Sequence, residues 1–337
     1  MTAYSLPVTP VGVLGTGSYL PARTVPNDEV AALAGVTAEW IERKTGVVER
    51  RYAADDEAAS DLAAHAAARA LEDAGVRAED VAWTIVATST PDHPQPATAA
   101  LVQYRIGAVN AAGFDVNAVC AGFVVALQTA ASLLAGDPTG QSRALVVGTE
   151  VYSRIIDRSD RRTAPLFGDG AGAVVLGPVG ERHGILGTGL VTEGHLHDLI
   201  GVAAGGSRTP ASAETLARHE HSFRMRGRDV REYVMRELPP AVAGLLDHLG
   251  VKPDEIDHFV PHQANGAMLR DAWEVLGLPR ARAHLPVSLH GNTGAASIPL
   301  ALDDAHRAGK LCDGELVLLA GFGGGMTLGT GLLSWVG

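Results

Sequence analysis

The chain has 337 residues, of which 46% are apolar and 19% charged, so it can form a large core, and long disordered tails are not expected. The formal net charge is −11 and no stretch is rich in lysine and arginine. This argues against a nucleic-acid partner but leaves room for a local site that binds an anion. Two cysteines, no signal peptide and no long apolar run indicate a cytoplasmic protein without membrane contact.

Apolar runs of strand length alternate with alanine-rich helical stretches. Residues 60–74 predict a helix with Ser60 as its N-cap and Gly75 directly after its end. This alternation favours a layered α/β fold with a largely parallel sheet. Buried strands are predicted at residues 81–88, 144–149 and 315–320, and a buried helix at residues 121–134.

An internal repeat runs through the chain. Residues 71–81 (LEDAGVRAEDV) match residues 246–256 (LDHLGVKPDEI) with a shift of 175 residues, and residues 167–170 (FGDG) resemble residues 322–325 (FGGG). Either match alone is weak, but two in the same order favour a duplicated unit. We therefore expect one half at residues 1–180 and a second at residues 181–337.

The repeat predicts which segments meet. The same shift carries Cys120 into the turn of residues 291–297 (GNTGAAS), and carries the end of the first buried strand onto residues 261–263 (PHQ). If the halves pack about a pseudo-twofold axis, these three segments converge at strand ends, where open α/β sheets bind their ligands.

Cys120 follows a predicted strand end and precedes the helix of residues 121–134. A helix N-terminus favours the reactive thiolate, so Cys120 is a candidate nucleophile. A small buried core thiol is the commoner fate of a lone cysteine, and the pattern alone leaves both interpretations open. Cys312 lies in a polar stretch before a strand and is expected to be inert.

Two further polar residues lie at predicted strand ends or tight turns. His262 follows the apolar residues 256–260 and suits a general base or an oxyanion donor, although a hydrogen-bonded turn histidine fits as well. Asn292 lies between Gly291 and Gly294, where its amide could donate to an oxyanion or simply form a turn. The glycines of residues 321–325 could bring backbone N–H groups close to a substrate oxygen.

Other motifs are set aside. Residues 15–20 (GTGSYL) lack the third glycine and the later acidic residue of a dinucleotide site. The histidine pairs at residues 195–197 and 219–221 have no matching Cys or His pair for zinc. We therefore expect no metal site and no bound cofactor.

Six motifs in this order resemble the β-ketoacyl-acyl-carrier-protein synthase III family and its polyketide-priming relatives, over nearly the whole chain. The resemblance implies the thiolase fold, with duplicated layered α-β-α-β-α halves related by a pseudo-twofold axis. The motifs are WIERKTG (residues 40–46), CAGF (120–123), FGDGAG (167–172), PHQAN (261–265), GNTGAAS (291–297) and GFGGG (321–325).

The resemblance implies a ping-pong reaction. An acyl group moves from coenzyme A to Cys120, malonyl-acyl carrier protein loses carbon dioxide, and the resulting carbanion attacks the Cys120 thioester. His262 and Asn292 would stabilise the enolate, and the backbone N–H groups of Cys120 and Gly324 would form the oxyanion hole. Coenzyme A is a substrate here, and neither a metal nor a redox cofactor is implied.

The resemblance implies that four residues bind coenzyme A. Trp40 matches the tryptophan that stacks on adenine, and Arg161 matches the arginine on the other face of that ring. Lys44 stands where an arginine usually binds phosphate, and keeps the charge without the bidentate geometry. Asn265 matches a residue beside the pantetheine arm.

Three positions depart from the family pattern. Gly266 and Ala267 replace a Leu-Arg pair whose arginine docks the carrier protein, and the nearest arginine is Arg270. Gln95 stands where family homodimers close the acyl pocket of the partner with an apolar residue. Val119 replaces the small residue before the nucleophile. These differences bear on the carrier protein and the primer rather than on the covalent step.

Competing hypotheses remain at this stage. An acyltransferase of the same fold could pass the acyl group of Cys120 to an oxygen or nitrogen without decarboxylation. A Cys-His-Asn thioesterase or amidase would need an open water path, which the apolar, glycine-rich surroundings disfavour. A protein with no catalytic activity is the least supported interpretation.

Overall fold

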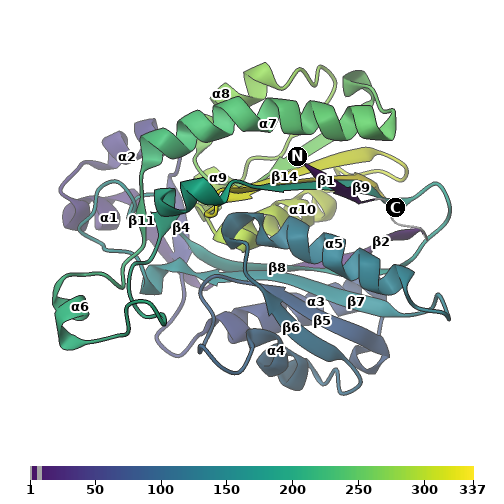
Figure 1. Cartoon of the computed structure of the whole chain (residues 1–337), viewed down its shortest axis with the longest axis horizontal. Coiled ribbons are helices and arrows are strands. Elements are labelled where there is room, and N and C mark those ends of the chain that lie inside the picture. The colour runs from purple at the N-terminus through teal and green to yellow at the C-terminus, as the bar shows by residue number, and fades with distance from the viewer. Residues whose placement is uncertain (1, 6–9) are drawn as a thin grey trace.

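The computed structural model describes residues 2–5 and 10–337, and forms five layers in which helices alternate with two sheets (Figure 1). The first sheet has the strand order β2 (Val11–Tyr19), β8 (Asp169–Pro178), β7 (Arg143–Val151), β5 (Val81–Ala87) and β6 (Ala112–Val116). The second has the order β1 (Ala3–Ser5), β9 (Gly184–Thr192), β15 (Thr327–Ser334), β14 (Leu316–Gly323), β12 (His258–Pro261) and β13 (Arg282–Ala283).

Two small sheets lie outside these layers, β3 (Arg23–Pro26) with β4 (Glu49–Tyr52) and β10 (Ile200–Gly201) with β11 (Arg224–Met225). The α-helices are α1 (Asn27–Ala34), α2 (Ala38–Thr45), α3 (Ala59–Ala74), α4 (Thr98–Ile106), α5 (Gly122–Ala135), α6 (Ala213–Ala217), α7 (Gly227–Leu249), α8 (Gly266–Val275), α9 (Val287–His290) and α10 (Ser297–Arg307). The 3-10 turns are η1 (Ala78–Asp80), η2 (Val119–Ala121), η3 (Tyr152–Arg154), η4 (Gly194–Leu199), η5 (Pro253–Glu255) and η6 (Gly294–Ala296).

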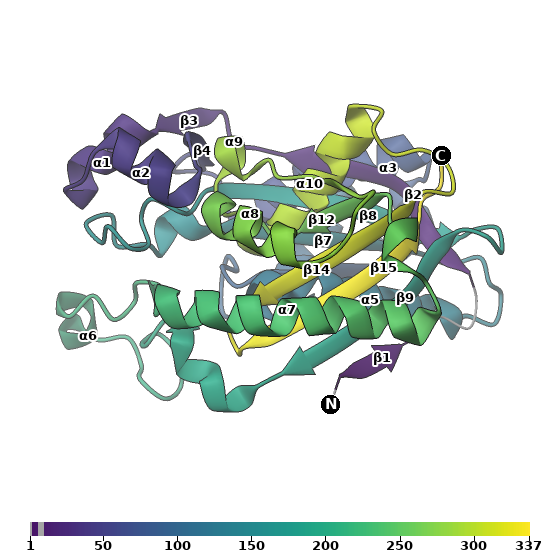
Figure 2. The same cartoon turned by 90° about the horizontal axis from the view of Figure 1, so that it is seen from above.

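The middle layer consists of α5 and α10, which lie between the two sheets. Helix α5 contacts β5 and β7 of the first sheet and β14 and β15 of the second. It is apolar enough to be buried on both sides, as the sequence predicted, and its Phe123 and Leu127 pack with Ile298 and Leu302 of α10. Helices α3 and α4 cover the first sheet, and α7 crosses the outer face of the second (Figure 2).

The two sheets share one topology. Apart from β1, the second sheet repeats the strand order and the strand directions of the first. The predicted division near residue 180 falls in the connection of residues 179–183 between β8 and β9, and stays a prediction. The expectation of a largely parallel sheet was wrong, because β8 and β15 pair antiparallel on both sides and need no crossover helix.

The repeated sequence forms the same structure twice. Helix α3 ends at Gly75 and α7 at Gly250, both in the left-handed conformation with φ of 62° and 67°, and each is followed by a 3-10 turn and a strand. The shift of 175 residues also relates η2 and the start of α5 to η6 and the start of α10. The match between Phe167 and Phe322 was wrong, because Phe167 precedes β8 whereas Phe322 lies within β14.

Helix α3 starts earlier than predicted. Ala58, not Ser60, is its N-cap, because the backbone N–H of Ala58 bonds the carboxylate of Asp61 and helical geometry begins at Ala59. The backbone N–H and the hydroxyl of Ser60 both donate to Asp92, at 2.8 and 2.6 Å. Ser60 therefore anchors the loop after β5 rather than the helix end.

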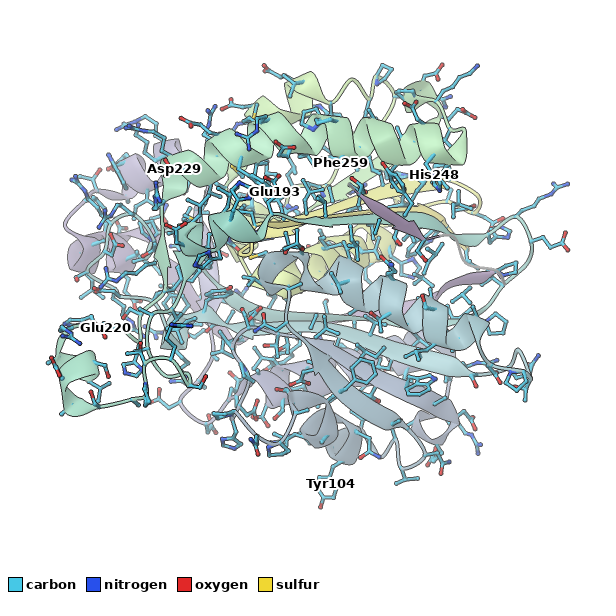
Figure 3. All side chains as sticks on the ribbon, in the orientation of Figure 1. Tyr104, Glu193, Glu220, Asp229, His248 and Phe259 are labelled. Atoms are coloured by element: carbon cyan, nitrogen blue, oxygen red, sulfur yellow. The ribbon has the colours of Figure 1, made fainter. Side chains whose placement is uncertain are left out.

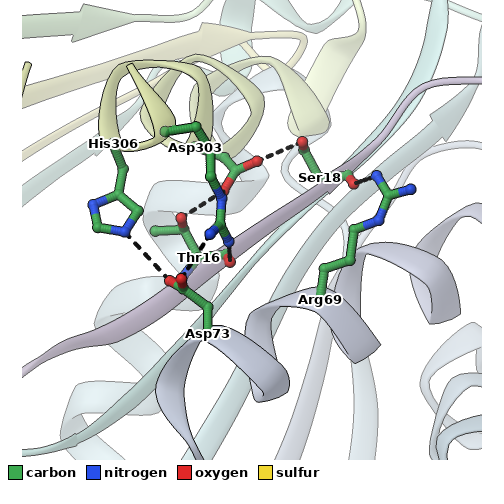
Figure 4. A network of polar contacts seen from close by, with 7 residues as sticks. Thr16, Ser18, Arg69, Asp73, Asp303 and His306 are labelled. Carbon is green, nitrogen blue, oxygen red and sulfur yellow. Dashed lines mark hydrogen bonds and ion pairs between the residues drawn. The ribbon is translucent and has the colours of Figure 1, made fainter. Parts of the chain in front are cut away.

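A polar network joins α10 of the second half to β2 and α3 of the first half (Figure 4). Thr16 and Ser18 of β2 donate their hydroxyl groups to the Asp303 carboxylate of α10, at 2.6 and 2.5 Å. Arg307 of α10 pairs with Asp73 of α3 at 2.8 Å. These contacts fix α10, the helix that begins just after Asn292, against the first half of the chain.

Candidate active site

A cavity of about 410 Å³ opens between the two halves. The predicted catalytic residues lie at its floor, and basic side chains lie at its mouth. Its floor includes Cys120, His262 and Asn292, which are only 7%, 2% and 5% exposed. Cys120 lies in η2, His262 follows β12, and Asn292 lies between α9 and η6. The structure thus brings together the three segments that the repeat predicted to converge.

Cys120 is held in a strained turn. The preceding residue, Val119, has φ of 48°, a left-handed conformation that a β-branched side chain rarely adopts. Burial raises the pKa of the Cys120 thiol and the charge of Glu150 raises it further, whereas the Tyr152 hydroxyl and the Cys120 backbone N–H lower it. The favourable effect expected at a helix N-terminus is therefore outweighed by burial, and the resting form is the thiol.

The end of β14 packs directly on the nucleophile turn. A Cβ atom at Gly323 would lie 2.7 Å from the Cys120 nitrogen, and one at Gly321 would lie 3.1 Å from the Ala121 Cα, so only glycine fits this approach. Gly324 follows the strand, next to Val119 and Ile200. Its expected role as an oxyanion donor stays a prediction, and within residues 321–325 it is Gly323 rather than Gly324 that lines the cavity.

His262 is buried and neutral. Its Nδ1 lies 2.7 Å from the Ser297 hydroxyl, and its ring meets Phe322 edge-on at 5.1 Å. Burial lowers the pKa of His262 to about 3, so the imidazole is uncharged at neutral pH. Among the described residues, Nε2 has no hydrogen-bond partner, which leaves that nitrogen for a ligand in the cavity.

Asn292 is oriented by its own turn. Its Oδ1 accepts from the Gly294 N–H at 2.9 Å, and Nδ2 donates to the Ala264 carbonyl at 3.4 Å. The backbone N–H of Asn292 donates to the Leu166 carbonyl at 2.7 Å. These bonds direct the amide group and leave the second Nδ2 hydrogen without a partner among the described residues.

The mouth of the cavity is basic although the chain is acidic. Trp40 and Lys44 from α2 line the cavity with Arg161, and their binding of coenzyme A stays a prediction. Sequence analysis missed three more arginines at the mouth, Arg162, Arg228 and Arg231. Isolated arginines in polar stretches give no signal before the fold places them side by side.

Two polar side chains near the mouth have structural partners. Asn265 lines the cavity as predicted, but its Oδ1 caps α8 by accepting from Met268 and its Nδ2 donates to the Lys44 carbonyl. It therefore joins α2 to α8. Arg270 is exposed, lies near Gly46 and does not line the cavity.

Gln95 does not line the cavity of the single chain. It is exposed in the loop between β5 and α4, so its expected position at an acyl pocket depends on a second subunit. Within the described ranges, no cluster of three or more His, Cys, Asp or Glu side chains is arranged to hold a metal ion.

Sequence analysis also missed polar residues behind Cys120. Glu150, at the end of β7, is fully buried, and Tyr152 follows it in η3. Ser89, just after β5, bonds both of them. The one available signal was a glutamate at the end of an otherwise apolar strand, since a buried carboxyl group needs specific partners.

Comparison with known proteins decides the family. Residues 114–194 match the model of 3-oxoacyl-[acyl-carrier-protein (ACP)] synthase III, and residues 246–335 match the model of its C-terminal part. An acetoacetyl CoA synthase of Streptomyces sp. (strain CL190) is 52% identical over 96% of this chain and 98% of that protein. The chain belongs to the β-ketoacyl-[acyl-carrier-protein] synthase III family.

Further members of the synthase III family agree in sequence and structure. The β-ketoacyl-[acyl-carrier-protein] synthase III of Clostridioides difficile (strain 630) is 42% identical over 97% of this chain and 99% of that protein. The crystal structure of 3-oxoacyl-(acyl carrier protein) synthase III from Pseudomonas aeruginosa PAO1 matches with a TM-score of 0.88 at 39% identity, covering 97% of this chain and 99% of that one.

Membership confirms the predicted fold and reaction class. The chain is an acyltransferase with the thiolase fold, and its reaction is the decarboxylating Claisen condensation of fatty-acid or polyketide biosynthesis. None of its described helices combines the length and the apolar character needed to cross a bilayer.

Proposed function

We propose that the enzyme condenses an acyl group, taken from acyl-coenzyme A and held on Cys120, with the carbanion formed when malonyl-acyl carrier protein loses carbon dioxide. The observation that carries the proposal is the common cavity floor formed by Cys120, His262 and Asn292 beneath a basic mouth. That floor offers one sulfur nucleophile and two neutral hydrogen-bonding groups in a buried, largely apolar setting.

Loading depends on the mouth of the cavity. Lys44, Arg161 and Arg228 have no acidic partner within 4 Å among the described residues, so they can pair with the phosphates of coenzyme A. Trp40, half-buried on α2, would stack on adenine. The pantetheine arm would then reach past Asn265 and bring the thioester to Cys120.

Condensation depends on His262 and Asn292. Ser297 donates its hydroxyl proton to the Gly294 carbonyl at 2.8 Å, and its oxygen accepts from the backbone N–H of Gln263 at 3.3 Å and lies 2.7 Å from Nδ1 of His262. When that hydroxyl turns from Gly294 to donate to Nδ1, the imidazole proton lies on Nε2 and is donated into the cavity beside Nδ2 of Asn292. Two donors then stabilise the enolate oxygen as carbon dioxide leaves, and a neutral imidazole does not quench the carbanion.

A second candidate places malonate on coenzyme A instead of a carrier protein. Gly266 and Ala267 offer no cation at the first turn of α8, where the resemblance places the arginine that docks the carrier protein, and the next arginine, Arg270, lies one turn further along the helix. The relative at 52% identity is named an acetoacetyl CoA synthase, a product carried on coenzyme A.

The rate of carbon dioxide release with each malonyl donor separates these candidates. Enzyme primed with acetyl-coenzyme A should release carbon dioxide and form a β-ketoacyl thioester with at least one malonyl donor, malonyl-acyl carrier protein or malonyl-coenzyme A. Preference for the carrier protein supports the first candidate, and preference for coenzyme A supports the second. Acetyl transfer to water or an amine without carbon dioxide release would contradict both.

We further propose a cytoplasmic homodimer. Strand β6 is an edge of the first sheet, and its Asp115 accepts bonds from the backbone N–H groups of Thr98 and Ala99 at the end of the Gln95 loop. Pairing of β6 with a second copy would bring that loop to the partner, where Gln95 would favour short or terminally polar acyl groups. Tyr104 projects from α4, the helix that follows the Gln95 loop, and is 84% exposed (Figure 3).

A further inference from the structure

A row of polar side chains leads from Cys120 into the protein, and its members Tyr152, Ser89 and Glu150 do not line the cavity. The Tyr152 hydroxyl lies close enough to Cys120 to lower the pKa of its thiol, and it lies 3.0 Å from the Ser89 hydroxyl. Ser89 in turn donates to Oε1 of Glu150 at 2.8 Å. The condensation chemistry described above gives no role to Tyr152, Ser89 or Glu150.

We propose that Tyr152 and Ser89 conduct the thiol proton of Cys120 to Glu150, which holds it while the acyl-enzyme exists. The inference rests on the proposed function, in which Cys120 is the residue that is acylated. Tyr152 touches the reacting sulfur, whereas Glu150 acts through the two hydroxyl groups.

The hydrogen bonds have one consistent direction. With Glu150 ionised, the single hydroxyl proton of Ser89 goes to the carboxylate, so Tyr152 donates to Ser89 and its oxygen is free to accept from the Cys120 thiol. Moving one proton along each bond reverses all of them, and Tyr152 then donates to the Cys120 thiolate. Either arrangement satisfies every hydroxyl group in the row.

The step balances over the reaction. Cys120 loses its proton to Tyr152, Tyr152 passes its own to Ser89, and Ser89 passes its own to Glu150. The thiolate attacks the acyl carbon, the bond to the sulfur of coenzyme A breaks, and that thiolate takes a proton from water. Condensation later expels Cys120 as a thiolate, which recovers the stored proton from Glu150 by the reverse path.

Electrostatics favour Glu150 over His262 as the acceptor. Burial raises the pKa of Glu150 to about 7, whereas burial lowers the pKa of His262 to about 3, so the carboxylate binds a proton far more readily. The Glu150 charge also raises the pKa of the Cys120 thiol. Neutralising Glu150 therefore removes one of the causes that oppose formation of the thiolate.

Packing buries Tyr152 and Glu150, whereas Ser89 between them is partly exposed. Tyr152 is 1% exposed and Glu150 is fully buried, and the Tyr152 ring stacks on Phe167 at 4.4 Å. A Cβ atom at Gly294 would lie 2.6 Å from the Tyr152 ring and 2.8 Å from Glu150, so the Asn292 turn closes over both. The path thus remains available when coenzyme A fills the cavity and excludes water.

Single-turnover acylation of Cys120 tests the path. We expect Tyr152→Phe and Glu150→Gln each to slow acylation roughly a hundredfold, the scale of a lost proton-transfer group. The double variant should be no slower than either single variant, because both interrupt one path. Wild-type acylation should be slower in D2O than in H2O, and the variants should show a smaller ratio.

Thr149→Val is the matched control, since Thr149 precedes Glu150 on β7 but donates its hydroxyl to the Ala59 carbonyl at 2.9 Å, off the path. It should acylate within a few-fold of the wild-type rate. Wild-type speed in Tyr152→Phe, additive losses in the double variant, or an equal loss in Thr149→Val would each overturn the proposal. Tyr152→Phe removes one oxygen, so the test stands even if Glu150→Gln fails to fold. Failure of wild-type Cys120 to acylate would instead contradict the proposed function.

Discussion

The raised pKa of Glu150 predicts that the protein becomes less stable as the pH rises. Burial raises its pKa from 4.5 to about 7 in the folded protein, so the folded state binds a proton that the unfolded state has already lost between these values. The free energy of unfolding must therefore fall as pH rises through this window. Below pH 4.5 the carboxyl group is protonated in both states and contributes no such difference.

The size of the effect follows from the pKa difference. Each pKa unit corresponds to about 1.4 kcal/mol, so between pH 5 and pH 8 the ionisation of Glu150 should lower the free energy of unfolding by roughly 2–3 kcal/mol. Glu150→Gln carries no charge at any pH and should lack this loss. Urea unfolding of both proteins at equal concentration across this range measures the difference directly.

Subtracting the unfolding free energy of the variant from that of the wild type at each pH cancels the contributions of the other titrating groups. His262 has its pKa lowered to about 3 by burial, so it changes stability in the opposite direction, and equally in both proteins. We expect the wild type to lose stability relative to Glu150→Gln as pH rises. A constant difference from pH 5 to pH 8 would refute the reasoning, because Glu150 would then titrate as an exposed carboxyl group does.

Three substitutions test the cavity. Asn292→Ala should reduce carbon dioxide release roughly a hundredfold while Cys120 acylation survives, and equal losses would indicate a structural role. Trp40→Ala should raise KM for acyl-coenzyme A roughly tenfold without affecting a short pantetheine thioester, since only the former carries adenine to stack, and equal effects on both would make Trp40 a packing residue. Gly323→Ala should slow acylation roughly a hundredfold, because its Cβ would lie 2.7 Å from the Cys120 nitrogen. Gly331→Ala, with its nearest neighbour at 3.6 Å, is the matched control and should acylate normally.

The part of the fold that the sequence predicted follows from local rules. Gly75 and Gly250 end helices in the left-handed conformation, and this chemistry is visible in any sequence. Because two such units recur with a constant spacing, the convergence of Cys120, His262 and Asn292 could be expected before any contact was known. The antiparallel pairing of β8 and β15 could not, since a strand sequence does not reveal the direction of its neighbour.

The site shows the same division. Cys120 was found from its place between a predicted strand end and a helix, and Asn292 from the glycines on either side of it. Glu150 and Tyr152 were missed because their meaning depends on Ser89, some 60 residues away in the chain, and on a close approach to Gly294. The helix N-terminus was expected to favour the thiolate of Cys120, but burial raises the pKa of its thiol.

The most direct test of the account follows the fate of the acyl group on Cys120. Enzyme acylated with acetyl-coenzyme A and freed of excess donor would be mixed with malonyl thioester, and intact mass, carbon dioxide and product would be measured together. The account predicts that the acetyl mass leaves Cys120 as one carbon dioxide and one β-ketoacyl thioester form for each acetyl group. Loss of the acetyl group as free acetate, with no carbon dioxide released, would contradict it.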